Sequence, residues 1–259
     1  NQEFRLSSKP GAEIFWVIGA NYYTNHRDRD TTDVVELFYP ANGMNAEIRR
    51  TFRTENFGIF GETTYPLTQK LKVTAGLRQS WEKKTYSADW YANPNNPSLT
   101  RYAHDSQKLS DGYTTGRLAL SYQPNNNINF YGIYSRGYKT GGFNDEGTDF
   151  AVYGISDPEY KAAIVNSFEL GMKTVNADGS LGLNLAAFLN DTKREHLLAY
   201  DTVTMVSLVE NYDTRSYGLE LSSFMETEWG LRVTGSVGYT KAEIVGSPGS
   251  SLAQVDKHN

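Results

Sequence analysis

The sequence predicts an all-β fold, namely an antiparallel up-and-down transmembrane β-barrel to which this chain contributes about ten strands. Two observations carry this prediction. Long stretches alternate between apolar and polar residues, which gives a sheet one face for lipid and one for water. Short turns and long loops also alternate strictly between these stretches, as they do at the two rims of outer-membrane barrels, whereas a soluble sandwich has no reason to segregate its loops.

The alternation is clearest in residues 166–199, which are expected to form two strands joined by a tight turn. In the second strand, apolar residues occupy every second position from Leu181 to Leu189. The turn contains Asp178-Gly179, and this pair supplies the positive φ that tight hairpins favour. Both strands exceed the five or six residues that are usual in soluble proteins.

Four strands are expected before this hairpin in the first third of the chain, and four more flank it. The first four cover residues 3–8, 14–29, 52–65 and 71–86, and the others cover residues 113–122, 128–138, 209–225 and 231–244. The first is only about half a membrane span, and the faces of residues 128–138 stay unassigned because both carry aromatic side chains. In the others one face is apolar, as in Leu71, Val73 and Leu77 opposite Lys72 and Arg78.

Long polar loops are expected at residues 30–51, 88–111 and 139–163, with a shorter one near residues 200–208. Charged residues also occur at mid-strand on the polar faces, where they fit a hydrated lumen better than a packed core. They are Glu62, Lys72, Arg78, Glu82, Lys173, Glu220 and Arg232.

Composition narrows the remaining classes. No segment approaches the ~18–20 apolar residues of a membrane helix. The net charge of −5 argues against a nucleic-acid partner, and the absence of cysteine excludes disulfides and cysteine-ligated metals. The chain starts without an initiator Met or a signal peptide and ends in a loop-like segment, so we expect a fragment of a larger protein, truncated at both ends.

Four segments resemble the TonB-dependent outer-membrane receptors, a family of transporters that import ferric siderophores and other scarce nutrients. They follow one another in the order expected for the barrel of that family. They are ENFGIFGETTYPLTQKLKVTAGLRQSWEKKTY (55–86), INFYGIYSRGYKTGGFN (128–144), NSFELGMKT (166–174) and NYDTRSYGLELSS (211–223).

The resemblance implies that residues 1–259 are a central part of a 22-stranded barrel domain in the outer membrane of a Gram-negative bacterium. The plug domain of the family, and the segment before it that binds TonB, have no counterpart in the sequence. The implied function is active transport, foremost of a ferric siderophore complex, energised through TonB and the missing plug region. The expected partners are outer-membrane lipid, the TonB system and a small-molecule ligand, with no cofactor.

Aromatic residues in the expected outer loops are candidates for ligand contacts, since such rings stack on flat or apolar ligands above a lumen. The alternative is that they pack the loops together or belong to the interfacial girdle. These candidates are Trp90, Tyr91, Tyr102 and Tyr153.

No catalytic residue and no metal ligand is predicted. The four histidines form no HExxH motif or other close ligand pair, and the pairs His104-Asp105 and Asp191/His196 suggest a hydrolase only weakly. The glycine-rich residues 137–144 lack P-loop spacing and a following helix, so we interpret them as a strand end that enters an outer loop.

Two alternatives remain at this point. One is a closed ten-stranded outer-membrane barrel, which could be an enzyme and would require the first and last strands to pair. The other is a soluble β-sheet binding module, which would require a second sheet over the leucine-rich face of residues 181–189.

Overall fold

A computed structural model of the chain describes residues 1–34, 45–92, 101–144, 159–201 and 206–246, and shows a ten-stranded antiparallel sheet with a small two-stranded sheet beside it. The strands of the large sheet are β1 (Gln2–Ser7), β2 (Phe15–Val34), β3 (Asn45–Pro66), β4 (Leu71–Ala92), β5 (Arg101–Asn125), β6 (Ile128–Lys139), β9 (Ala163–Val175), β10 (Leu181–Asp201), β11 (Val206–Glu226) and β12 (Arg232–Gly246). The small sheet pairs β7 (Gly142–Phe143) with β8 (Glu159–Tyr160).

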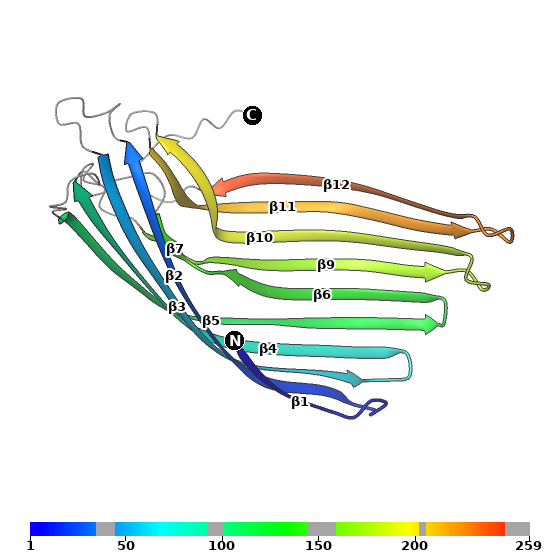
Figure 1. Ribbon diagram of the computed structural model, residues 1–259. Helices are drawn as coiled ribbons and strands as arrows, with labels where there is room; N and C mark the ends of the chain where they lie inside the picture. The colour runs from blue at the N-terminus through cyan, green and yellow to red at the C-terminus, as the bar shows by residue number, and fades with distance from the viewer. Residues whose placement is uncertain (35–44, 93–100, 145–158, 202–205, 247–259) are drawn as a thin grey trace.

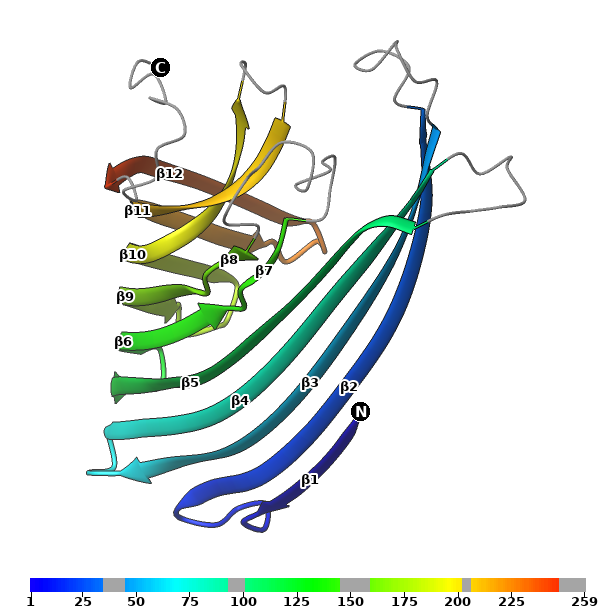
Figure 2. The same ribbon diagram turned by 90° about the vertical axis from the view of Figure 1, so that its left-hand side faces the viewer.

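The large sheet is an up-and-down meander, because each strand pairs with the next one of that sheet along the chain. It curves into an open arc, with β7 and β8 on its concave side (Figures 1 and 2). β1 and β12 are the two edges, and the described residues contain no pairing between them. The described strands therefore do not form the closed ten-stranded barrel that was the first alternative.

The two faces of the arc differ in chemistry as the alternation predicts. On the convex face Phe57 of β3 lies opposite Trp81 of β4, and their rings stack at 5.7 Å between centroids. Leu77 of β4 is 69% exposed on the same face, and no second layer of described residues covers it. The concave face carries paired polar side chains, such as Arg117 with Glu62 at 2.7 Å. This apolar exterior excludes the soluble module for the described part of the chain.

The apolar belt of the convex face has the height of a membrane. Along β3 it runs from Tyr65 near the short turn to Phe57, a separation of eight residues or about 27 Å at the usual strand rise. Tilting of the strands reduces this length toward the ~25 Å band of outer-membrane barrels. Beyond Phe57 the convex face becomes charged, with Glu55 opposite Lys83. Among the described residues, no helix is long and apolar enough to cross a bilayer.

The faces of β6 can now be assigned. Its Tyr134 lies beside Phe168 on the convex face, with ring centroids 5.0 Å apart. Tyr131 instead points to the concave face, where its hydroxyl donates to Glu169 at 2.8 Å. Both faces carry aromatic rings because Tyr131 combines an apolar ring with a hydrogen-bonded hydroxyl.

The strands are longer than the alternation predicts. All four segments that were expected to be loops contain some β-structure. In the first, β2 and β3 pair from Asp28 with Thr51 to Val34 with Asn45. Likewise β4 continues to Ala92 opposite a β5 that already begins at Arg101. The prediction of loops over the whole of residues 30–51, 88–111 and 200–208 is therefore wrong in extent. The physical reason is that these extensions have water on both sides, so pairing continues after the apolar–polar alternation has stopped.

Candidate functional site

The described residues on either side of residues 145–158 cross the concave side of the arc, near the rim opposite the short turns (Figure 2). We call residues 140–144 and 159–162 the strap. They contain β7 and β8 and bring together two parts of the sheet that are far apart in strand order, namely β3–β4 and β10–β11. Most of the buried hydrophobic side chains of the described chain lie in the strap or in the strand ends that it contacts.

The first anchor of the strap is an apolar contact with β3 and β4. Phe143 is 8% exposed and stacks on Tyr86 of β4, with 5.4 Å between ring centroids. Ile48 of β3 and Ala88 of β4 complete the cluster and are almost fully buried. Burying an aromatic ring of this kind stabilises the contact by about 2–3 kcal/mol, which is enough to fix a short segment.

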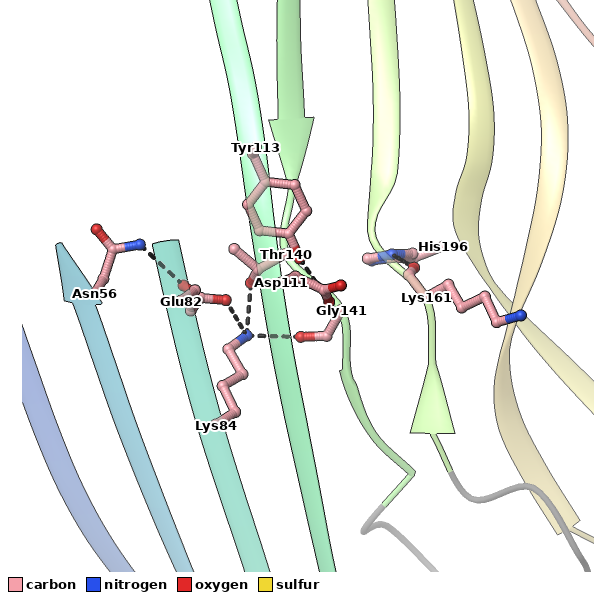
Figure 3. A network of polar contacts seen from close by, with 9 residues as sticks. All are labelled: Asn56, Glu82, Lys84, Asp111, Tyr113, Thr140, Gly141, Lys161 and His196. Carbon is pink, nitrogen blue, oxygen red and sulfur yellow. Dashed lines mark hydrogen bonds and ion pairs between the residues drawn. The ribbon is translucent and has the colours of Figure 1, made fainter. Parts of the chain in front are cut away.

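The second anchor is the ammonium group of Lys84 on β4. Its Nζ donates to the hydroxyl of Thr140 and to the carbonyl of Gly141, both at 2.6 Å, and lies 3.4 Å from Glu82 (Figure 3). The Lys84 and Glu82 side chains are only 19% and 11% exposed. Asn56 of β3 approaches Glu82 at 3.5 Å. Because the site is shielded, each hydrogen bond from the charged donor is worth more than one on an open surface.

The third anchor joins the strap to β11. The side chain of Asn144 forms a two-way hydrogen-bond pair with the backbone of Val209, at 2.6 and 3.1 Å. The side chain of Asn211 does the same with the backbone of Lys161, at 2.8 and 2.9 Å. In both pairs an asparagine amide replaces the backbone partner that a neighbouring strand would offer. The strap is thus connected to this side by strand-like hydrogen bonds.

Close packing of the two halves of the strap explains its paired glycines. A Cβ added to Gly141 would lie 2.6 Å from the carbonyl oxygen of Tyr160, and one added to Gly142 would overlap the ring of Tyr160. Any larger residue would therefore force β7 and β8 apart. The interpretation of residues 137–144 as a strand end that enters an outer loop is confirmed, since β6 ends at Lys139, and residues 140–144 then fold over the concave face.

His196 of β10 lies against the strap, beyond the apolar belt. Its Nε2 is 2.8 Å from the carbonyl oxygen of Lys161 (Figure 3). Its ring meets that of Tyr160 edge-on, with 4.8 Å between ring centroids. Burial lowers the pKa of His196, and the nearby ammonium group of Lys139 adds to this effect. The imidazole is therefore kept neutral, and protonating it would place a further cation beside Lys139.

Glu195, the neighbour of His196, is held by Lys139 at 2.7 Å. Burial acts to raise the pKa of Glu195, but the hydrogen bonds from Lys139 and from the amide of His196 outweigh it and leave the pKa lowered. Glu195 is therefore an anion that balances Lys139. The arrangement is a fixed set of charges with no nucleophile–base pair, and it is suited to binding and support.

Comparison with known proteins now assigns the family. The family model described as the β-barrel of TonB-dependent receptor-like proteins matches residues 1–259. The chain belongs to the TonB-dependent receptor family. Members of this family are transporters and receptors of the Gram-negative outer membrane, not enzymes, and that membrane is the location of this chain.

Two curated receptors are similar to the chain in sequence. The metal-pseudopaline receptor of Pseudomonas aeruginosa is 28% identical over 163 residues, which cover 61% of this chain and 22% of the receptor. The ferrichrome outer membrane transporter and phage receptor of Escherichia coli is 27% identical over 192 residues, which cover 73% of this chain and 23% of the transporter. The chain therefore spans less than a quarter of the length of these relatives.

Solved structures share the fold. The ferric yersiniabactin uptake receptor of Yersinia pestis superposes with a TM-score of 0.71 at 18% identity, over 93% of this chain and 35% of that receptor. A siderophore receptor of Acinetobacter baumannii gives a TM-score of 0.63 at 15% identity, over 95% of this chain and 38% of that receptor.

Three of the aromatic residues proposed as ligand contacts in this TonB-dependent receptor are neighbours in the pairing of β4 with β5, since Trp90 pairs with Ala103 and Tyr91 with Arg101 on either side of Tyr102. Trp90 lies in β4 and Tyr102 in β5, with only their backbones described, and Tyr153 lies outside the described residues. Tyr91 of β4 shares the convex face with Arg49 of β3, whose guanidinium carbon is 4.8 Å from the Tyr91 ring centroid. The structure therefore brings the backbones of Trp90, Tyr91 and Tyr102 together where β4 ends and β5 begins, and their ligand contact stays a prediction.

In the structure, the histidines and acids singled out in the sequence contact other residues than the ones they were paired with. His104 contacts Asp89 of β4 at 2.7 Å, on the convex face. Asp191 is engaged by Arg215 at 2.7 Å, whereas His196 contacts the strap. Sequence reasoning missed the strap as a site. The available signal was the apolar Phe143 next to two glycines and an asparagine, which is unusual for a solvated loop.

Proposed function

We propose that the complete receptor carrying this chain imports a metal chelate, foremost a ferric siderophore complex, by active transport energised through TonB. The curated relatives support a chelate as cargo, since their names specify metal-pseudopaline and ferrichrome. The observation in the chain that carries the proposal is the strap, which crosses the polar concave face above a wall that is apolar outside. This arrangement suits a water-filled passage with a structured entrance.

In this proposal the chain supplies barrel wall, lumen lining and parts of the outer loops. The strands that complete the barrel, and the plug region that contacts TonB, belong to the rest of the receptor. The open edges support this view, because hydrocarbon offers no hydrogen-bond partner to the free backbone groups of β1 and β12. Residues 1–259 are then a central part of the barrel domain.

Uptake measurements test the proposal. A strain that lacks its own siderophore receptors would produce the complete receptor and be supplied with ⁵⁵Fe bound to ferrichrome, a catecholate or a mixed-ligand siderophore. We expect uptake of at least one complex that depends on the receptor and disappears when TonB is deleted. Unchanged uptake in the TonB-deleted strain would refute energisation through TonB, and no uptake of any of these iron chelates would refute the proposed cargo class.

The proposed aromatic ligand contacts are tested separately. Trp90→Leu and Tyr102→Leu should each weaken binding of the transported chelate by about two- to tenfold, since an aromatic ring of the ligand, such as a catecholate, stacks on an aromatic side chain with about 0.5–1.5 kcal/mol. Tyr91→Leu is the internal comparison, because the Tyr91 ring already contacts Arg49. Titration of ligand into the purified receptor gives the affinities. Unchanged affinity in all three variants would remove these residues from the binding site.

A further inference from the structure

An apolar groove interrupts the lipid-facing side of the arc between β5 and β9. Its volume is about 340 Å³, and its lining includes Leu118, Leu120, Gly132, Tyr134, Phe168 and Leu170. These residues lie in register on the convex face, with Gly132 between Leu120 and Leu170 and Tyr134 between Leu118 and Phe168. The groove exists because Gly132 has no side chain, and an added Cβ would lie only 3.0 Å from Leu170.

A groove at this place must be occupied by something apolar. It lies within the belt that faces hydrocarbon, so water is excluded, and an empty groove would forfeit dispersion contacts along its walls. The two walls are also exposed to the membrane, since Leu118 is 51% and Leu170 is 70% exposed. A lipid acyl chain fits both the apolar lining and the location.

A cationic group lies directly beyond the groove on the same strand. Arg136 is the next convex-face residue after Tyr134, four residues or about 13 Å from Gly132. The Tyr134 hydroxyl donates to Oδ1 of Asn166 at 2.9 Å, and Nη1 of Arg136 donates to the same oxygen at 3.1 Å. A neutral amide thus orients the guanidinium without neutralising it.

The surroundings leave the charge of Arg136 available. Its neighbour on β5 is Gly116, which has no side chain. On the other side, beyond Asn166, the nearest acid in register is Asp191, and that carboxylate is engaged by Arg215 at 2.7 Å. Arg136 has no acidic partner among the described residues. Its side chain is exposed on the rim where the long loops emerge, which is the cell-surface side of such barrels.

We propose that this surface binds one phosphate-bearing lipid of the outer leaflet, with an acyl chain along the groove at Gly132 and a phosphate on Arg136. The arginine fork matches phosphate geometry and can use two donors at once. Basic residues at the membrane surface contribute to anionic lipid binding in this way. The inference depends on the outer-membrane location and not on which chelate the receptor transports.

The test uses the complete receptor in detergent, titrated with lipid A and followed by native mass spectrometry. The wild-type receptor should bind one lipid A more tightly than the rest, and Arg136→Gln should weaken that binding about fivefold, as expected for one surface cation. Dephosphorylated lipid A should bind the wild-type receptor as weakly as lipid A binds the variant. Gly132→Leu, which fills the groove, should weaken binding of both lipids.

Matched controls separate the site from general effects. Arg215→Gln removes a cation at the same level on β11 that is already paired with Asp191, and Ala20→Leu enlarges a convex-face residue on β2. Both should leave lipid A binding unchanged. Equal binding by wild type, Arg136→Gln and Arg215→Gln would overturn the proposal, as would the absence of a tight lipid in the wild type. Arg136→Gln changes an exposed side chain, so this outcome can be read even if Gly132→Leu does not assemble.

Discussion

At the scale of single residues, successive side chains of a strand point to opposite faces of the sheet, so alternate positions contact lipid and water. Leu77 lies at mid-belt on the convex face of β4, and Thr74 of the same strand lies on the concave face, where its hydroxyl contacts Thr64 at 2.8 Å. Leu77→Arg should therefore reduce assembly of the complete receptor, at a cost of about 2–4 kcal/mol for a charge at mid-membrane.

Thr74→Arg is the matched variant and should assemble nearly normally, because its charge can reach water in the lumen. The fraction of receptor that stays folded on an unheated gel measures both effects. Equal loss in the two variants would contradict the assignment of faces.

His196 makes the position of the strap dependent on pH. We call the strap seated when Tyr160 and Lys161 contact His196, and open when they do not. The pKa of His196 is lowered by burial in the seated state, and Lys139, Lys84 and Glu195 are the charged groups that act on it. The seated state therefore binds fewer protons than the open state. Its stability is fully present above the ordinary histidine pKa of ~6.5 and is lost as the pH falls from there through the lower value of the seated state.

A cysteine reporter measures this effect, since the native chain has no cysteine. Ala162 is 5% exposed in the strap, so Ala162→Cys should react with a thiol reagent faster at pH 5 than at pH 7, relative to Lys161→Cys on the exposed surface. Adding His196→Gln should abolish the difference. A ratio that stays constant from pH 7 to pH 5 would refute control by His196.

At the scale of elements, the strap depends on Lys84. Lys84→Met keeps the length of the side chain but removes the hydrogen bonds to Thr140 and Gly141. A hydrogen bond to a charged group contributes about 1.5–3 kcal/mol, so amide hydrogen exchange in residues 140–144 should become about 10- to 100-fold faster. Lys83→Met, on the convex face of the same strand, should leave the exchange unchanged. Equal exchange in both variants would show that Phe143 and the two asparagine pairs hold the strap without Lys84.

The elements also show how far sequence reasoning reaches. The lipid-facing halves of the strands follow from a period of two, because one face of residues such as Leu181–Leu189 must be apolar. The outer halves do not follow from it. Residues such as Asp28 and Thr51 pair with each other where water lies on both faces of the sheet. The strap could not be predicted from the sequence either. Its contacts join Phe143 to Tyr86 and Asn144 to Val209, and no local sequence pattern specifies such distant partners.

At the scale of the whole molecule, stability is distributed unlike that of a soluble domain. The wall is one layer thick, and most of its large apolar side chains are exposed, as Leu170 and Val237 illustrate. The surrounding lipid has to cover them. The buried hydrophobic residues gather instead around the strap, which links β3–β4 with β10–β11 across the arc. The strap thus takes the place of a core at the outer end of the wall.

The open edges lead to the last prediction, which concerns the chain by itself. β1 has six residues, fewer than the ~9–11 that span a membrane, and neither it nor β12 has a partner on its outer edge among the described strands. Free backbone groups in hydrocarbon each cost several kcal/mol, so the isolated arc must satisfy them by pairing with other copies. Refolding residues 1–259 alone in detergent should therefore give aggregates or mixed oligomers on size-exclusion chromatography. A uniform, heat-resistant monomer that migrates as a compact barrel on an unheated gel would show instead that β1 and β12 can close the wall.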